Sequence, residues 1–106
     1  MQANEVYIAH VSWGDGGKRR PVLVLGCNAN SVIAFNITTQ YENKSDSIRS
    51  KYFPITEWRQ AGLNNESYID TNNTITLPLS AVEHQLGVLS DSDSKNLREF
   101  LSKKIG

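Results

Sequence analysis

The stretch GDGGKRRPVLVLG, residues 14–26, places three consecutive cations between a glycine-rich turn and an apolar run. Glycine lets a backbone approach a ligand closely, and exposed backbone N–H groups can hold an anion. Lys18, Arg19 and Arg20 follow the glycines, and an arginine fork binds phosphate with two parallel hydrogen bonds. Pro21 fixes the backbone where the loop enters the strand, so Arg20 should be the best ordered of the three. These residue types are therefore suited to gripping a phosphate.

An ordinary β-turn explains the same residues without any ligand. In that interpretation GDGG is the turn, Asp15 is a turn residue, and the cations form a solvated edge that discourages strand pairing. The overall charge does not favour a polyanionic partner, because Lys plus Arg and Asp plus Glu number 11 each. The first 60 residues hold only a small excess of cations, which permits a local anion site and does not require one.

Metal-dependent and nucleoside-triphosphate chemistry find little support in the sequence. It contains no CxxC, HExxH or GxSxG motif, and GDGGKRR lacks the spacing and the hydroxyl residue of a phosphate-binding P-loop. We therefore expect no metal and no cofactor. The single Cys27 cannot form an internal disulfide, which fits a reducing cytoplasm, and we expect no signal peptide and no membrane span.

The length of 106 residues suits one domain, residues 1–106, and the apolar pattern predicts mainly β structure with small helices. The strands are expected at residues 5–12, 21–25, 31–38, 52–55, 67–70 and 74–78. We expect a polar exposed loop over 40–51 and a short helix over 56–62, capped by Thr56. Ser90, with Asp93 three residues later, resembles a capping box that begins a C-terminal helix. Together these elements predict a strongly curved sheet or barrel closed by that helix.

KRRPVLVLG, followed by a strand that ends in NITTQ, resembles the MazF/PemK toxin family in its PemK-like branch. The later segments IRSKYFPITEWRQAGL, SYID, ITLP and LGVLSDSDSKNLREFL are similar to the same branch, so the likeness spans nearly the whole chain. The resemblance implies an SH3-like barrel of the MazF/PemK/CcdB type, a homodimer, and metal-independent cleavage of single-stranded RNA through attack by the 2′-OH. It also implies a cytoplasmic toxin and a cognate antitoxin whose flexible segment fills the RNA groove.

The family's catalytic arginine, directly before proline, falls on Arg20, and its strand-ending threonine falls on Thr38. A slip of one residue to Thr39 would turn the hydroxyl to the other face of the strand. Arg20 is suited to stabilising the negative charge of a phosphorane, and the Thr38 hydroxyl offers a second hydrogen bond. A free arginine is a poor general base because its pKa lies above about 12.

The remaining candidates surround these two residues. The loop before Arg20 is short and lacks a polar insert common in the family, so His10 is a candidate for proton transfer, against a half-buried strand residue as the alternative. Tyr41 could stack on an unpaired base. The full set of expected substrate-binding residues is Gly17, Lys18, Arg19, Thr39, Gln40 and Tyr41.

Two other functional classes fit the same pattern of elements. A CcdB-like toxin shares the implied barrel but poisons gyrase without being a nuclease, and an SH3-like adaptor would only bind a protein partner. The combination of Arg20-Pro21 with a strand that ends in threonine favours the nuclease, because a pure binding module needs neither.

Overall fold

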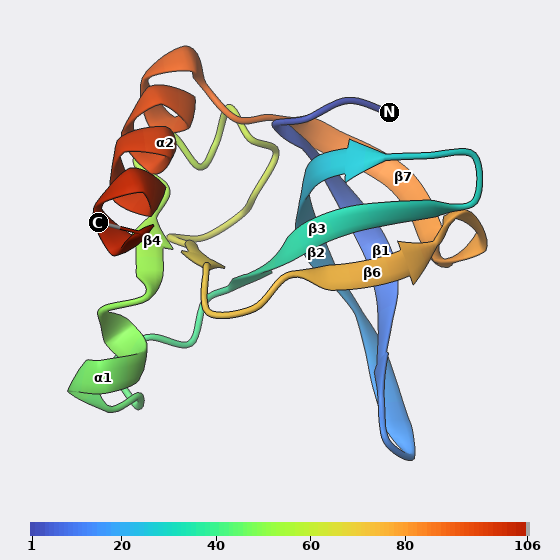
Figure 1. Cartoon of the computed structure of the whole chain (residues 1–106), viewed down its shortest axis with the longest axis horizontal. Coiled ribbons are helices and arrows are strands. Elements are labelled where there is room, and N and C mark those ends of the chain that lie inside the picture. Colours follow the sequence, from blue (N-terminus) through green and yellow to red (C-terminus); the bar gives the residue numbers. More distant parts are fainter. Residues whose placement is uncertain (106) are drawn as a thin grey trace.

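A computed structural model describes residues 1–105, apart from the side chains of Trp13, Lys104 and Ile105. The strands are β1 (Glu5–Trp13), β2 (Gly16–Cys27), β3 (Ser31–Thr38), β4 (Tyr52–Pro54), β5 (Tyr68–Asp70), β6 (Ile75–Pro78) and β7 (Val82–Val88). The helical elements are the single turn α1 (Asp46–Arg49), the 3₁₀ turn η1 (Leu79–Ala81) and the C-terminal helix α2 (Asp91–Ile105). The predicted mainly β fold with a closing helix is confirmed (Figure 1).

The seven strands form an antiparallel sheet in the order β4-β5-β3-β2-β1-β7, with β6 beside β3. The β1–β2 hairpin is long, and its tip projects beyond the curved sheet (Figure 1). β3 pairs with both β2 and β6 along its first part and with β5 at its end. The first half of the chain therefore supplies the centre of the sheet, and the short later strands extend it on both sides.

Two apolar clusters cover the two faces of β2, which explains its uninterrupted apolar run. Leu23 belongs to a cluster that extends to Phe53 and Ile69 on the short strands and to Leu97 on α2. Val22 and Val24 point to the opposite face and belong to the second cluster, with β1, β3 and β6. Successive residues of a strand point to opposite faces, so only a strand covered on both sides reads as continuously apolar.

The structure differs from the sequence-based prediction at residues 82–88 and at residues 56–62. The apolar pattern predicts no strand at 82–88, where β7 pairs with β1, because Glu83, His84 and Gln85 are exposed and mask the alternation. Residues 56–62 form consecutive turns rather than a helix. Gly62 adopts a positive φ of 85° and lies so close to β7 that a Cβ would approach the Leu86 carbonyl oxygen to 2.1 Å. The polar segment 40–51 lies where expected, but it contains the single turn α1.

Asp93 connects the C-terminal helix to the 56–62 turns. The Ser90 hydroxyl accepts the Asp93 N–H at 3.1 Å, as expected of a helix cap. The fully buried Asp93 carboxylate instead accepts the backbone N–H groups of Thr56 at 3.1 Å and Glu57 at 2.8 Å. One side chain from α2 therefore satisfies two donors at the beginning of a loop 36 and 37 residues earlier in the chain.

We predict that Asp93→Ala destabilises the protein by about 2–3 kcal/mol, because it leaves two backbone N–H donors in part-buried positions without their charged acceptor. The free energy of unfolding is measured by urea denaturation. Asp91→Ala is the matched control: it removes an exposed acid from the same helical turn and should cost less than about 1 kcal/mol. Equal losses for the two variants would contradict this role of Asp93.

Candidate functional site

A pocket opens where β3 separates from β2. The two strands are paired up to Val22 opposite Asn36, and the same register continued would place Arg20 opposite Thr38. Beyond Asn36, however, β3 no longer pairs with β2, and Thr38 pairs only with Tyr68 of β5, which lies on the other side of β3 in the sheet order. Pro21, which has no N–H to donate to a ladder, stands next to this point. The separation leaves an open pocket of about 250 Å³, which we call the cationic pocket.

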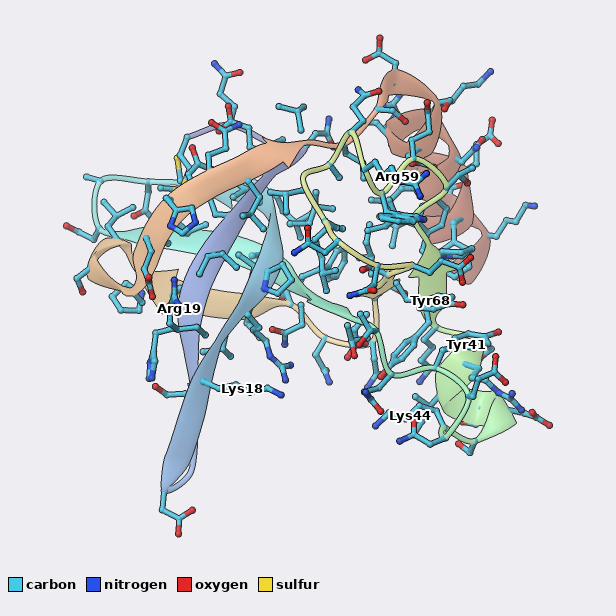
Figure 2. The ribbon with its side chains drawn as sticks, turned by 180° about the vertical axis from the view of Figure 1, so that it is seen from behind. Lys18, Arg19, Tyr41, Lys44, Arg59 and Tyr68 are labelled. Atoms are coloured by element: carbon cyan, nitrogen blue, oxygen red, sulfur yellow. The ribbon has the colours of Figure 1, made fainter. Side chains whose placement is uncertain are left out.

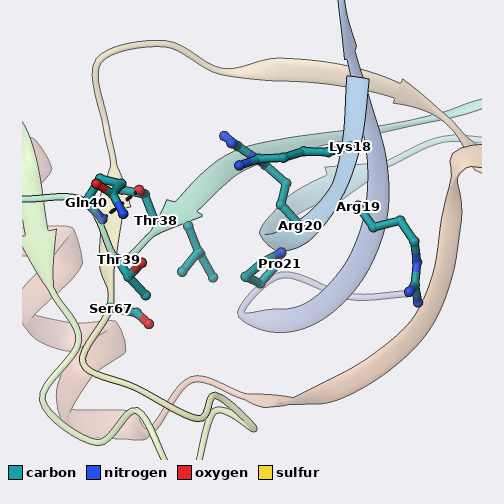
Figure 3. A pocket seen from close by; sticks show the side chains of 9 residues that line it. Lys18, Arg19, Arg20, Pro21, Thr38, Thr39, Gln40 and Ser67 are labelled. Atoms are coloured by element: carbon teal, nitrogen blue, oxygen red, sulfur yellow. Dashed lines mark hydrogen bonds between the residues drawn. The ribbon is translucent and has the colours of Figure 1, made fainter. Parts of the chain in front are cut away.

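Arg20 and Lys18 supply the positive charge of this pocket. They lie two residues apart on β2 and therefore share a face, and both line the pocket. Figure 3 shows their side chains on the same side of the strand, directed towards the end of β3. Arg20 is half-buried and close enough to Tyr52 for its charge to oppose the effect of burial, which raises the pKa of that phenol.

Thr38 and Thr39 both line the pocket, but from opposite sides of the chain. Thr38 follows Ala34 and Asn36 in the alternation of β3, so it shares the face of Val22 and Arg20. Its Oγ1 accepts the Gln40 N–H at 3.0 Å, which fixes the oxygen and leaves the hydroxyl hydrogen to donate elsewhere (Figure 3). The alternation of β3 therefore places Thr38 on the face of Arg20 and Thr39 on the opposite face.

Arg19 borders the pocket, but its guanidinium points to the other side of β2 (Figure 3). There it forms two 2.9 Å hydrogen bonds from Nε to the Glu83 carboxylate on β7. His10, opposite Arg19 in the β1–β2 register, is exposed on this same outer face, with Nδ1 3.4 Å from the Ser12 hydroxyl. The structure therefore does not bring His10 to the cationic pocket.

Of the other predicted binding residues, some line the cationic pocket and some lie away from it. Gln40 lines the pocket, whereas Gly17 lies further out on the hairpin against His10. Tyr41 lies near α1 and stacks on Tyr68, with ring centroids 4.3 Å apart, and the Arg49 guanidinium lies 5.6 Å from its ring centroid (Figure 2). A base that stacks on Tyr41 would therefore have to share the ring with Tyr68 and Arg49 or displace them.

Ser67 also lines the pocket, although the sequence does not identify it as a site residue. It is buried, and its hydroxyl donates to the Asn65 carbonyl at 2.8 Å. Ser67 comes next to Thr39 only because β3 pairs with β5. A serine before a short strand does not indicate this pairing.

Two classes of feature are missing from the described part of the chain. Residues 1–105 contain no group of three or more His, Cys, Asp or Glu side chains placed to hold a metal ion. None of the described helices is long and apolar enough to cross a membrane.

Comparison with known proteins adds family information to this geometry. Residues 2–105 match the family model described as "PemK-like, MazF-like toxin of type II toxin-antitoxin system". The Mycobacterium tuberculosis toxin MazF-mt6 is 26% identical, with a TM-score of 0.72 over 93% of each chain. Another M. tuberculosis toxin is 25% identical, with a TM-score of 0.65 over 91% of this chain and 97% of that one.

A mycobacterial endoribonuclease, solved in complex with its cognate antitoxin, is similar in fold. It is 17% identical, with a TM-score of 0.68 over 100% of this chain and 93% of that one. A search of curated proteins gave no match.

We predict that Arg19→Ala raises the pKa of the Glu83 carboxyl towards its ordinary value, because hydrogen bonds from Arg19 now lower it. A lowered pKa means that the pair stabilises the fold above the ordinary carboxyl pKa and that this contribution is lost as pH falls through the lowered value. The measurement is an NMR titration of the Glu83 side chain. Arg59→Ala, which removes a cation stacked on Trp58, should leave the Glu83 titration unchanged.

Proposed function

Because the chain belongs to the PemK-like, MazF-like toxin family of type II toxin-antitoxin systems, we propose that it is an endoribonuclease. Its substrate is single-stranded RNA, and the reaction requires no metal ion. The observation that carries the proposal is that Arg20 from β2 and Thr38 from β3 line one open, cationic pocket. The open shape and positive charge of the pocket fit a phosphate of single-stranded RNA. Such RNA is flexible and can enter the pocket without the unwinding of a duplex.

In the proposed reaction, the 2′-oxygen of one nucleotide attacks the adjacent phosphorus. The bond from 2′-oxygen to phosphorus forms, the bond from phosphorus to the 5′-oxygen breaks, and the products carry a 2′,3′-cyclic phosphate and a 5′-OH. The Arg20 guanidinium stabilises the negative charge that accumulates on the phosphorane, and the Thr38 hydroxyl donates a second hydrogen bond. Lys18 adds positive charge at the mouth of the same pocket.

The two proton transfers need carriers besides Arg20 and Thr38. The 2′-OH loses a proton as it attacks, and the 5′-oxygen gains one as it leaves. No histidine or carboxylate is among the described residues that line the cationic pocket. We therefore assign both transfers to water, which reaches the pocket because it is open to solvent.

The family also supports proposals about partners and location. We propose that the chain is a single toxin domain, that it forms a homodimer, and that a cognate antitoxin inhibits it, as the complex formed by the fold-related mycobacterial endoribonuclease suggests. A toxin that acts on messenger RNA would act in the cytoplasm.

We predict that Arg20→Gln and Thr38→Val each slow RNA cleavage by about 100-fold or more, because each removes a donor aimed at the developing charge. The assay uses a long unstructured RNA with EDTA, and circular dichroism checks that the variants are folded. Thr38→Ser keeps the hydroxyl and should retain most activity, and Thr39→Val should slow cleavage less than Thr38→Val.

Two controls test whether these losses are specific. Arg59→Gln removes a cation and Thr76→Val removes an exposed strand hydroxyl, and neither residue lines the cationic pocket, so both variants should cleave like the parent. RNA that stays intact at high concentrations of the parent protein would overturn the nuclease and favour a toxin that only binds a protein.

We predict that Lys18→Ala lowers the salt dependence of RNA binding, because Lys18 contacts one phosphate. In a Thr38→Val background, the slope of log affinity against log salt should fall by about 0.7, the value per phosphate for single strands. Lys95→Ala on the exposed face of α2 is the matched control. An unchanged slope for Lys18→Ala would remove Lys18 from the interface.

A further inference from the structure

A second pocket lies next to the cationic pocket and differs from it in chemistry. It has a volume of about 230 Å³, and we call it the neutral pocket. Its apolar side chains are Ile8, Pro21, Leu63 and Leu86, which are half-buried or buried. No charged residue is among the described residues that line it. The neutral pocket is therefore unsuited to a phosphate and suited to an uncharged, partly apolar group.

The rim of the neutral pocket is polar. Asn64, Asn65 and Thr39 line it and are exposed, whereas the apolar members lie deeper. Each asparagine amide carries two donors and one acceptor oxygen, and the threonine hydroxyl can do either. An apolar interior with neutral donors and acceptors at its edge is the arrangement that holds a planar ring by its faces and recognises it by its edge.

The wall that carries these amides is held in place from two sides. Gly62 packs against Leu86, and a Cβ on Gly87 would in turn approach the Ala61 carbonyl carbon to 2.6 Å. The Asp93 carboxylate holds the beginning of the same loop through Thr56 and Glu57. A wall fixed by backbone packing and a buried carboxylate can discriminate between similar ligands, because little ordering is needed when they bind.

The two pockets are continuous. Pro21, Thr39 and Ser67 line both of them. Pro21 and Ile8 lie on the face of the β1–β2 ribbon opposite Arg20. The two pockets therefore meet at the gap between β2 and β3, where the sheet is interrupted and its two faces are connected. A ligand with a phosphate and an attached ring could therefore occupy both at once.

We propose that the neutral pocket binds one nucleobase of the RNA whose phosphate lies at Arg20, and that Asn64 and Asn65 read the edge of that base. The inference rests on the proposed ribonuclease activity and assigns its sequence preference to a particular site. Single-stranded RNA is read in this way, by bases turned out of the stack, packed on side chains and hydrogen-bonded along their edges. The Pro21 ring and the leucine side chains supply the packing surface, and the amides supply the reading groups.

The test is a comparison of cleavage preferences rather than of activity alone. The parent protein and the double variant Asn64→Ala/Asn65→Ala digest an RNA pool with a randomised region, with EDTA present, and the cut sites are sequenced. The double variant should lose about tenfold of its preference at one position beside the cut, measured as the ratio of cleavage at preferred to cleavage at non-preferred sites. Asn65→Asp exchanges donors for an acceptor and should change which base is preferred there.

Asn73→Ala is the matched control, because Asn73 is an exposed asparagine in another loop and lines neither pocket. An active double variant with the preference of the parent would overturn the inference and leave the ribonuclease standing. A parent protein that cuts no RNA would overturn both together. Weaker binding of an antitoxin peptide by the double variant, with an unchanged cleavage preference, would assign the pocket to a protein partner and also overturn the inference.

Discussion

The candidate site depends on the point along β3 at which its backbone pairing with β2 ends. β3 pairs with β2 as far as Asn36 and with β5 from Ile37 onward. Beyond Asn36 the two strands separate, and the side chains that would have belonged to a continuous sheet border an opening instead.

The alternation of side chains along β2 then decides which cations serve this opening. Lys18 and Arg20 face it, whereas Arg19 faces outward and is paired with Glu83. Three cations in a row are therefore not one patch but two groups with different electrostatic surroundings. The outward pair ties the β1–β2 hairpin to β7, and Arg20 is the arginine that remains directed at the pocket.

The sequence predicted the elements whose signal is local. The apolar runs of β2 and β3, the turn between them and the Ser90 cap follow from neighbouring residues, and so does Arg20 before Pro21. The features that the sequence did not predict depend on contacts between residues distant in sequence: Gly62 with Leu86, Asp93 with Thr56, and Arg19 with Glu83. β7 was hidden by its exposed polar residues, and the outward position of His10 follows from a register that no single strand reveals.

The balance of charge over the whole chain constrains how RNA could be recognised. With 11 cations and 11 acids, the protein has no net charge to attract a polyanion over long distances. Recognition must then come from short-range contacts in which a phosphate, a base or both fit a particular surface. Two adjoining pockets, one cationic and one neutral, meet at Pro21, where the separation of β3 from β2 joins the two faces of the sheet. The strand separation that opens the cationic pocket at Arg20 thus also places an uncharged cavity beside it, where the base of the proposed RNA substrate would lie.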